Sequence, residues 1–179
     1  MTDQPADAAM AEFAGRLFQA ARDGDAAWLG ACLDNGLPPD LANEKGDSLL
    51  MLAAYHGRTE AVALLLRHGA DPDRPNDRGQ TPLAGAAFKG EHGVAEALLR
   101  GGEAVDHAGP DGRTALMVAA MFDRVELIDL LIAHGADAER RTPDGVTALG
   151  AAKAMGAARA ARRLEEGAGE ARAETMDRG

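Results

Sequence analysis

Histidine and cysteine, the side chains that most often bind metals or attack substrates, are few and scattered in this chain. Its 179 residues include five histidines and one cysteine. His68 and His134 each stand directly before a glycine, 66 residues apart, where a cation complements the C-terminal end of a helix. Zinc sites need several ligands at short spacings, and a reactive thiol needs an exposed, electropositive setting, whereas Cys32 falls on an apolar line. The sequence therefore predicts no metal site and an inert cysteine.

The carboxylates and the glycine-rich segments also lack the pattern of a catalytic site. Glu91, Glu96 and Glu126 fall on expected helix faces, where charged groups are normally solvated. The segment 90–93 begins a helix but follows no strand, so it lacks the context of a phosphate-binding loop. Catalysis needs a nucleophile, a base and a pocket that converge. We therefore expect a non-enzymatic protein without catalytic residues, cofactor or metal.

What organises the chain is a repeat of 33 residues. Two series of glycines, one of leucines and one of hydroxyl residues share this spacing: Gly46, Gly79, Gly112 and Gly145; Gly36, Gly69, Gly102 and Gly135; Leu17, Leu50, Leu83, Leu116 and Leu149; Ser48, Thr81, Thr114 and Thr147. A second apolar line comprises Cys32, Leu65, Leu98, Leu131 and Leu164. A fixed period of this length is typical of a solenoid, whose units contact only their neighbours and together present an extended surface.

Each unit is expected to contain a turn, a helix, a short turn and a second helix. In the second unit the helices are predicted near 48–56 and 59–68. The serine or threonine of each unit is a good N-cap, because its hydroxyl accepts from a free N–H of the first turn. Pro82 suits the first helical position, and Gly69 suits a left-handed helix end. The pattern predicts an all-α chain.

With these motifs the chain resembles the ankyrin repeat family over residues 12–165. The third unit reads Asp-Arg-Gly-Gln-Thr-Pro-Leu at 77–83, and Gly-Ala-Asp ends units at 69–71 and 135–137. The resemblance implies an ankyrin-repeat solenoid of about five helix-turn-helix units with short turn or hairpin connections. The family's histidine after the leucine is missing, and other residues stand there: Met51, Ala84, Met117 and Gly150. Since that histidine links neighbouring units by hydrogen bonds, reduced stability is expected.

The predicted domain runs from residue 7 to 165, in units 7–42, 43–75, 76–108, 109–141 and 142–165. Met10, Phe13, Ala14, Leu17 and Phe18 have the spacing of an amphipathic helix that caps the first unit. The segments 1–6 and 166–179 show no apolar period, and we expect them to be disordered.

Composition narrows the range of partners. There are 19 basic and 29 acidic residues, a net charge of −10, which disfavours nucleic acids and anionic membranes as partners. No apolar run approaches the ~20 residues of a membrane span, and no secretory signal is recognised. One cysteine permits no internal disulfide, so a cytoplasmic location is expected. Abundant Ala, Gly and Arg are typical of a GC-rich bacterium.

In ankyrin arrays the exposed side of the first helices and the turn tips line a concave face. The chain has six aromatic residues, and three of them map to this face in consecutive units. The predicted binding residues on the helices are Tyr55, His56, Phe88, Lys89, Met121 and Phe122, and those on the turns are Asp47, Arg78, Gln80 and Arg113. Aromatic residues and Met are enriched at interface centres. The same aromatics are also compatible with packing against the neighbouring unit.

We expect a protein-binding module that occupies one protein partner and thereby inhibits, shields or tethers it, and that is a monomer by itself. Two alternatives stay open. The first is an immunity or inhibitor protein for a toxin or enzyme, or an accessory factor for an enzyme. The second is a structural protein that associates with itself through the aromatic line.

Overall fold

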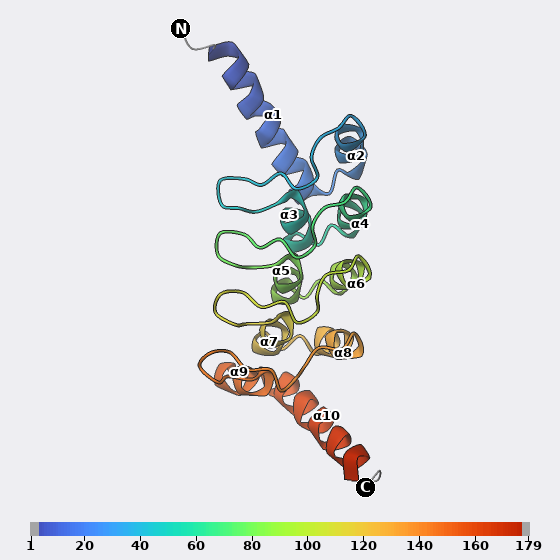
Figure 1. Ribbon diagram of the computed structural model, residues 1–179, viewed down its shortest axis with the longest axis vertical. Coiled ribbons are helices and arrows are strands. Elements are labelled where there is room, and N and C mark those ends of the chain that lie inside the picture. Colours follow the sequence, from blue (N-terminus) through green and yellow to red (C-terminus); the bar gives the residue numbers. More distant parts are fainter. Residues whose placement is uncertain (1–3, 177–179) are drawn as a thin grey trace.

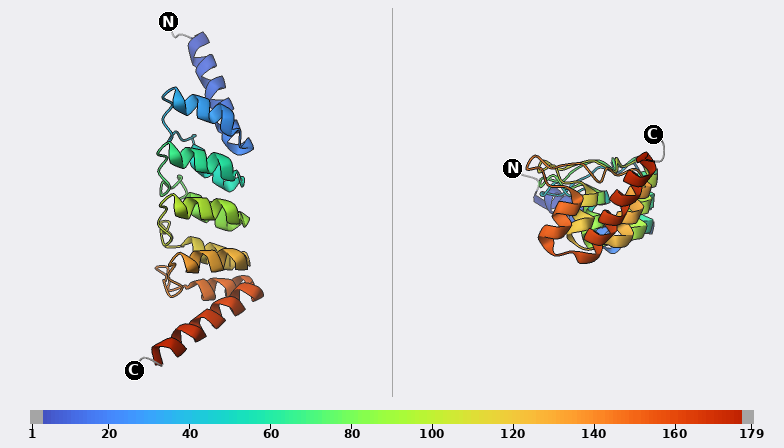
Figure 2. Two further views of the ribbon diagram at one scale, coloured as in Figure 1. Left: turned by 90° about the vertical axis from the view of Figure 1, so that its right-hand side faces the viewer. Right: turned by 90° about the horizontal axis from the view of Figure 1, so that it is seen from below.

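The computed structural model describes residues 4–176, with side chains for residues 8–167. Ten helices form five consecutive pairs in this part of the chain: α1 (Gln4–Asp23) with α2 (Ala26–Asp34), α3 (Leu49–Tyr55) with α4 (Thr59–Arg67), α5 (Pro82–Lys89) with α6 (His92–Arg100), α7 (Ala115–Met121) with α8 (Val125–Ala133), and α9 (Ala148–Met155) with α10 (Ala158–Met176). The pairs stack in single file, with the odd-numbered helices in one row and the even-numbered helices in a second (Figures 1 and 2). The predicted all-α solenoid is confirmed.

Hydroxyl caps start the first helix of the second to fifth units where the sequence predicts them. Ser48, Thr81, Thr114 and Thr147 each accept a hydrogen bond from the backbone N–H three residues ahead. The cap is the first residue outside the helix, so α3 spans Leu49–Tyr55 within the predicted range 48–56. At the other end of the unit, Gly69 follows α4 with a φ of +84°, the left-handed conformation expected there.

The apolar lines of the repeat form one continuous core between the two rows of helices. Leu65, Leu98 and Leu131 are completely buried, and the alanines at 53, 86, 119 and 152 let neighbouring helices approach closely. Cys32, predicted to belong to this core, is only half-buried, and α2 buries Leu29 and Leu33 instead. The reason is that α2 is the first helix of its row and has a neighbouring helix on one side only (Figure 1).

The turns between units project as a row of loops beside the odd-numbered helices (Figure 1). In the second turn, the side chain of Asn76 accepts from the backbone N–H groups of Arg78 and Gln80. Its amide also donates to the carboxylate of Asp47 in the preceding turn at 2.8 Å. Isolated β-bridges close two turns, between Ala42 and Ser48 and between Ala108 and Thr114. The second turn is thus fixed internally and tied to the first.

The terminal helices run farther than the sequence analysis expected. Residues 4–6 lie in α1 and residues 166–176 in α10, whereas disorder was expected for 1–6 and 166–179; residues 1–3 and 177–179 lie outside the described part. The absence of an apolar period does not prevent a helix, because Ala, Glu and Arg have high helix propensity by themselves. Both helices point away from the stack at its two ends (Figure 2).

Asp123 occupies the position of Gly57, Gly90 and Gly156 without disturbing the helix end. It adopts a φ of +57°, in the left-handed region that asparagine and aspartate tolerate best among residues with a side chain. Its carboxylate accepts from the backbone N–H of Ala160, at the start of α10, at 2.7 Å. The substitution therefore links the fourth unit to the fifth.

Candidate functional site

Three aromatic side chains form a contiguous line across the second, third and fourth units. The rings of Tyr55 and Phe88 stack with centroids 6.0 Å apart and planes 12° apart. Phe88 and Phe122 meet edge to face with centroids 4.6 Å apart. Each side chain nevertheless keeps 36–38% of its surface exposed. The rings therefore pack on one another across neighbouring units and still leave an exposed apolar strip. The binding role of this strip stays a prediction.

Three hollows follow one another between the odd-numbered helices and the turns, and we call them together the inner groove. The first, of about 260 Å³, has Tyr55 and Arg22 in its lining. The second, of about 240 Å³, is lined by Phe122 and Arg113 among others. The third, of about 280 Å³, reaches Met155. Phe88, Arg78 and Gln80 line both the first and the second hollow, and Met121, Asp111 and Arg113 line both the second and the third. The groove is therefore continuous.

Basic groups surround the aromatic strip at its N-terminal end. The Lys89 ammonium lies 5.0 Å from the centre of the Tyr55 ring, an arrangement in which the ring face attracts the cation. The pKa of His56 is lowered, first by its partial burial and then by the positive charges of Arg22, Arg58 and Lys89, against the opposing effect of Asp23. His56 therefore stays neutral over a wider pH range than a free histidine, and its neighbourhood is electropositive.

Nine of the ten predicted binding residues line the hollows of the inner groove, and Lys89 lies beside them over the Tyr55 ring. Arg78, Gln80 and Arg113 are exposed on the turns, and Met121 is half-buried in the lining of two hollows. Asp47 lines the first hollow but is only 9% exposed, and both of its carboxylate oxygens accept from asparagine amides, of Asn76 and Asn43. A buried carboxylate needs hydrogen-bond donors in place of water, so Asp47 also links two turns.

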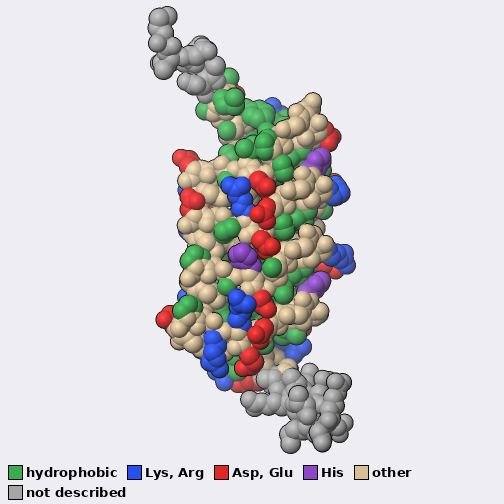
Figure 3. Space-filling view, viewed as in Figure 1, with side chains coloured by type: hydrophobic (Ala, Val, Ile, Leu, Met, Phe, Trp, Pro, Cys, Tyr) green, Lys and Arg blue, Asp and Glu red, His purple; other side chains and the backbone are tan. Residues whose placement is uncertain are grey.

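Figure 3 shows acidic side chains in a column along the array. A ladder of aspartates also connects successive units. The backbone N–H of Asp71 donates to Asp40, that of Ala104 to Asp73, and that of Asp137 to Asp106. The acceptors recur at the 33-residue period, a signal visible in the sequence that the sequence analysis did not use. These contacts supply links between units in a chain that lacks the family's histidine.

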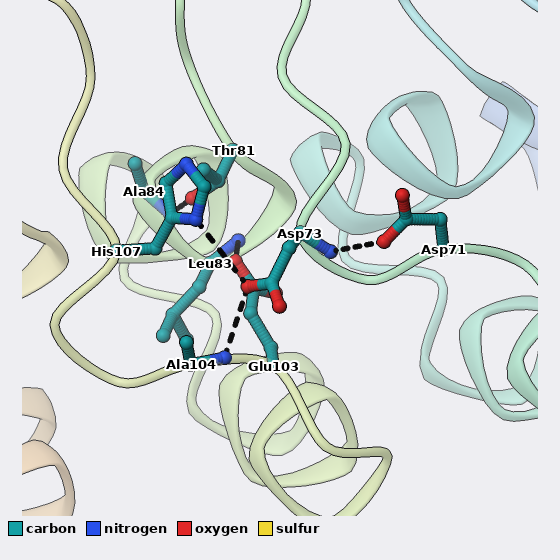
Figure 4. Close-up of polar contacts among 8 residues, drawn as sticks. All are labelled: Asp71, Asp73, Thr81, Leu83, Ala84, Glu103, Ala104 and His107. Carbon is teal, nitrogen blue, oxygen red and sulfur yellow. Dashed lines mark hydrogen bonds and ion pairs between the residues drawn. The ribbon is translucent and has the colours of Figure 1, made fainter.

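Glu103 is a second feature that the sequence analysis missed. Figure 4 shows its carboxyl beside Leu83, where one oxygen accepts from the backbone N–H of Leu83 at 3.0 Å. The other oxygen has no hydrogen-bond partner within the described residues. Burial raises its pKa to about 8, against the lowering effect of the bonds to Leu83 and Thr81, and the nearby Asp73 and Asp71 raise it further. The sequence does contain a signal for this residue, because Glu103 stands at the position where the units before and after have Ala70 and Ala136.

The structure also bears on metal binding and on membrane insertion. In the described part of the chain, no three His, Cys, Asp or Glu side chains lie close enough together to hold a metal ion. None of its helices combines the length and the apolar character that crossing a membrane requires.

The comparison with known families decides which class this solenoid represents. A family model described as ankyrin repeats (3 copies) matches residues 17–108 and residues 91–171. The chain belongs to the ankyrin repeat family. Ankyrin repeats are a protein–protein interaction module. A relative from Pseudomonas aeruginosa, PA3287, whose name describes it as an ankyrin repeat protein, is 53% identical over 60 residues. The match covers 32% of this chain and 35% of PA3287, so it spans about a third of that relative's length.

Proposed function

We propose that this ankyrin repeat protein is a non-enzymatic module that binds one protein partner in its inner groove and acts by occupying it, through inhibition, shielding or tethering. The observation that carries the proposal is the aromatic strip, because three rings that keep more than a third of their surface exposed in a continuous groove have the character of an interface centre. The single cysteine fits a reducing compartment such as the cytoplasm.

The size of the groove supports a protein rather than a small ligand as the occupant. Each hollow holds about 240 to 280 Å³, below the ~300–1,000 Å³ usual for small-molecule pockets. The residues that line the three hollows come from all five units, and a stable protein contact buries about 800 Å² on each side. A partner that also contacts the exposed turn residues beside the hollows can reach that area, whereas an occupant of one hollow cannot.

The test is an affinity capture from a lysate of the native host with the wild type and two variants. Tyr55→Ala, Phe88→Ala and Phe122→Ala together remove the strip, while Met10→Ala with Phe13→Ala removes exposed apolar groups from the first helix, outside the groove. We expect a protein that the wild type and the control variant retain and the strip variant loses, with circular dichroism confirming that all three are folded. A partner retained equally by all three would place the binding site elsewhere.

A further inference from the structure

The first two hollows of the inner groove carry a charge opposite to that of the whole chain. The net charge of the protein is −10, yet the first two hollows are lined by four basic side chains, Arg22, Lys45, Arg78 and Arg113, and Lys89 lies beside them over the Tyr55 ring. The acidic side chains in the same linings are Asp47 and Asp111. Asp47 is buried and hydrogen-bonded, and Asp111 is paired with Arg113 at 3.5 Å.

Most of these basic groups have no acidic partner of their own. Among the described residues, ion pairs within 4.0 Å involve neither Arg22, Lys45, Arg78 nor Lys89. The carboxylates of Asp40, Asp73 and Asp106 accept hydrogen bonds from the backbone of the next unit. These aspartates are thus engaged elsewhere, while the four basic groups along the groove have no ion-pair partner within 4.0 Å in the described part of the chain.

The spacing of the hollows suggests the form of the occupant. Adjacent packed helices lie about 8–10 Å apart. A chain in the extended polyproline II conformation advances ~3.1 Å per residue with three residues per turn, so every third side chain points the same way. Successive hollows are therefore about three residues of such a chain apart. A segment laid along the groove can direct every third side chain into successive hollows and its other side chains to the basic groups.

We infer that the partner presents to the inner groove an extended acidic segment, in which carboxylates face Lys45, Arg78 and Lys89 and apolar side chains recur about every third residue, one to each hollow, beside the strip of Tyr55, Phe88 and Phe122. The inference rests on the proposed function and specifies the chemical character of the segment that the partner presents. Carboxylates on such a segment pair with cations that the protein leaves free, and opposite charge also accelerates the encounter.

A single-stranded nucleic acid is the other polyanion that basic and aromatic groups can attract, and the groove fits it less well. Binding by stacking needs a free ring face for each base, whereas Tyr55 and Phe88 stack on each other and Lys89 lies over Tyr55. A strand with one charge per nucleotide would also meet the field of a chain whose net charge is −10. A peptide with a few carboxylates is repelled less.

The experiment is a selection from a displayed library of random 12-residue peptides against the full chain at 0.15 M salt, followed by anisotropy titrations of the enriched peptides labelled with fluorescein. Three variants are compared: Lys45→Gln with Arg78→Gln, the matched control Arg67→Gln with Arg140→Gln, and the Tyr55, Phe88 and Phe122 triple alanine variant. The control pair is exposed, lies outside the hollows and changes the net charge equally.

We expect enriched peptides that combine Asp or Glu with apolar residues three positions apart. Loss of the two cations should weaken their binding by about 3- to 10-fold, the range of one or two exposed ion pairs, with a shallower salt dependence, while the control stays within about 2-fold. Neutral or basic peptides that only the strip variant loses would overturn the acidic partner and leave the proposed function intact.

Each of the remaining outcomes would overturn the inferred partner. Peptides retained by the strip variant would overturn both the site and the partner's chemistry. A selection that enriches nothing would overturn the extended segment in favour of a folded partner surface. A labelled 20-residue oligo(dT) that binds the wild type and not the strip variant would show that the occupant is a nucleic acid. A molecular mass in solution that doubles with protein concentration, and does not do so in the strip variant, would show that the occupant is a second copy of the chain.

Discussion

At the residue scale, Glu103 replaces an alanine that the neighbouring units keep at the same position. Its folded-state pKa is about 8, against an ordinary value of 4.5. Between these two pH values the unfolded chain loses the Glu103 proton while the folded chain keeps it. The unfolded state then binds fewer protons, so the free energy of unfolding falls as the pH rises from about 4.5 to about 8 and levels off above.

The first prediction is that Glu103→Ala stabilises the protein, and does so more at pH 8 than at pH 5. Alanine restores the residue found at positions 70 and 136, and relief of an unsatisfied buried carboxyl is worth about 1–3 kcal/mol. Urea unfolding at both pH values measures it, with Glu103→Gln as the variant that keeps an acceptor for Leu83 but cannot ionise. Equal gains at the two pH values would show that Glu103 is not protonated in the fold.

The 33-residue register predicts which positions are buried but not what each side chain meets there. It placed Leu65 and Leu131 in the core and Thr81 at a cap, because these roles depend on position within the unit. It placed Asp47 in a turn, but it did not predict the hydrogen bond that its carboxylate accepts from the amide of Asn76 in the next turn. Contacts between units join residues about 30 positions apart, and a periodic pattern does not contain them.

The aromatic strip gives a second prediction at this scale. Phe88 contacts both Tyr55 and Phe122, whereas the outer two each contact one ring of the strip. An aromatic pair contributes about 0.5–1.5 kcal/mol, so Phe88→Ala should lower the free energy of unfolding by about 1–3 kcal/mol, and Tyr55→Ala or Phe122→Ala by roughly half as much. Urea titrations of the three variants measure this order. Equal losses would mean that stacking between the rings contributes little.

At the scale of elements, the turns rely on glycines for two separable reasons. Gly79 and Gly145 occupy the same turn position, with φ values of +73° and +81°. A Cβ on Gly79 would collide with the ring of Pro110 in the next turn, while nothing lies within 4 Å of a Cβ on Gly145, which belongs to the last turn. Both glycines avoid the conformational cost of a side chain, whereas of these two only Gly79 also has a close neighbour.

The third prediction compares alanine at these two positions. Gly145→Ala should cost about 1–2 kcal/mol, the penalty of the left-handed conformation for a residue with a Cβ. Gly79→Ala should cost more, because the turn of the third unit must also move away from Pro110. Thermal unfolding of the two variants gives the difference directly. Indistinguishable midpoints would show that adjacent turns separate freely and that the contact is not part of the stack.

At the scale of the whole molecule, stability depends on how strongly each unit is coupled energetically to its neighbours. Leu65 and Leu98 lie in α4 and α6, which pack directly, while α6 separates α4 from α8 and its Leu131 (Figure 1). In a linear array, stability is approximately a sum of terms for single units and for contacts between neighbours. The energetic coupling between two mutations should therefore be small once they are more than one unit apart.

The last prediction is a pair of double-mutant cycles. Leu65→Ala and Leu131→Ala should each cost about 2–5 kcal/mol, as buried leucines do, and together their costs should add to within about 0.5 kcal/mol. Leu65→Ala with Leu98→Ala should deviate from additivity by more than that, since α4 and α6 share a packed interface. Leu66→Ala, next to Leu65 but only half-buried, is the control and should cost less. A strong coupling between Leu65 and Leu131 would mean that the array behaves as one globular core, and that occupation of the inner groove at one unit is felt along its whole length.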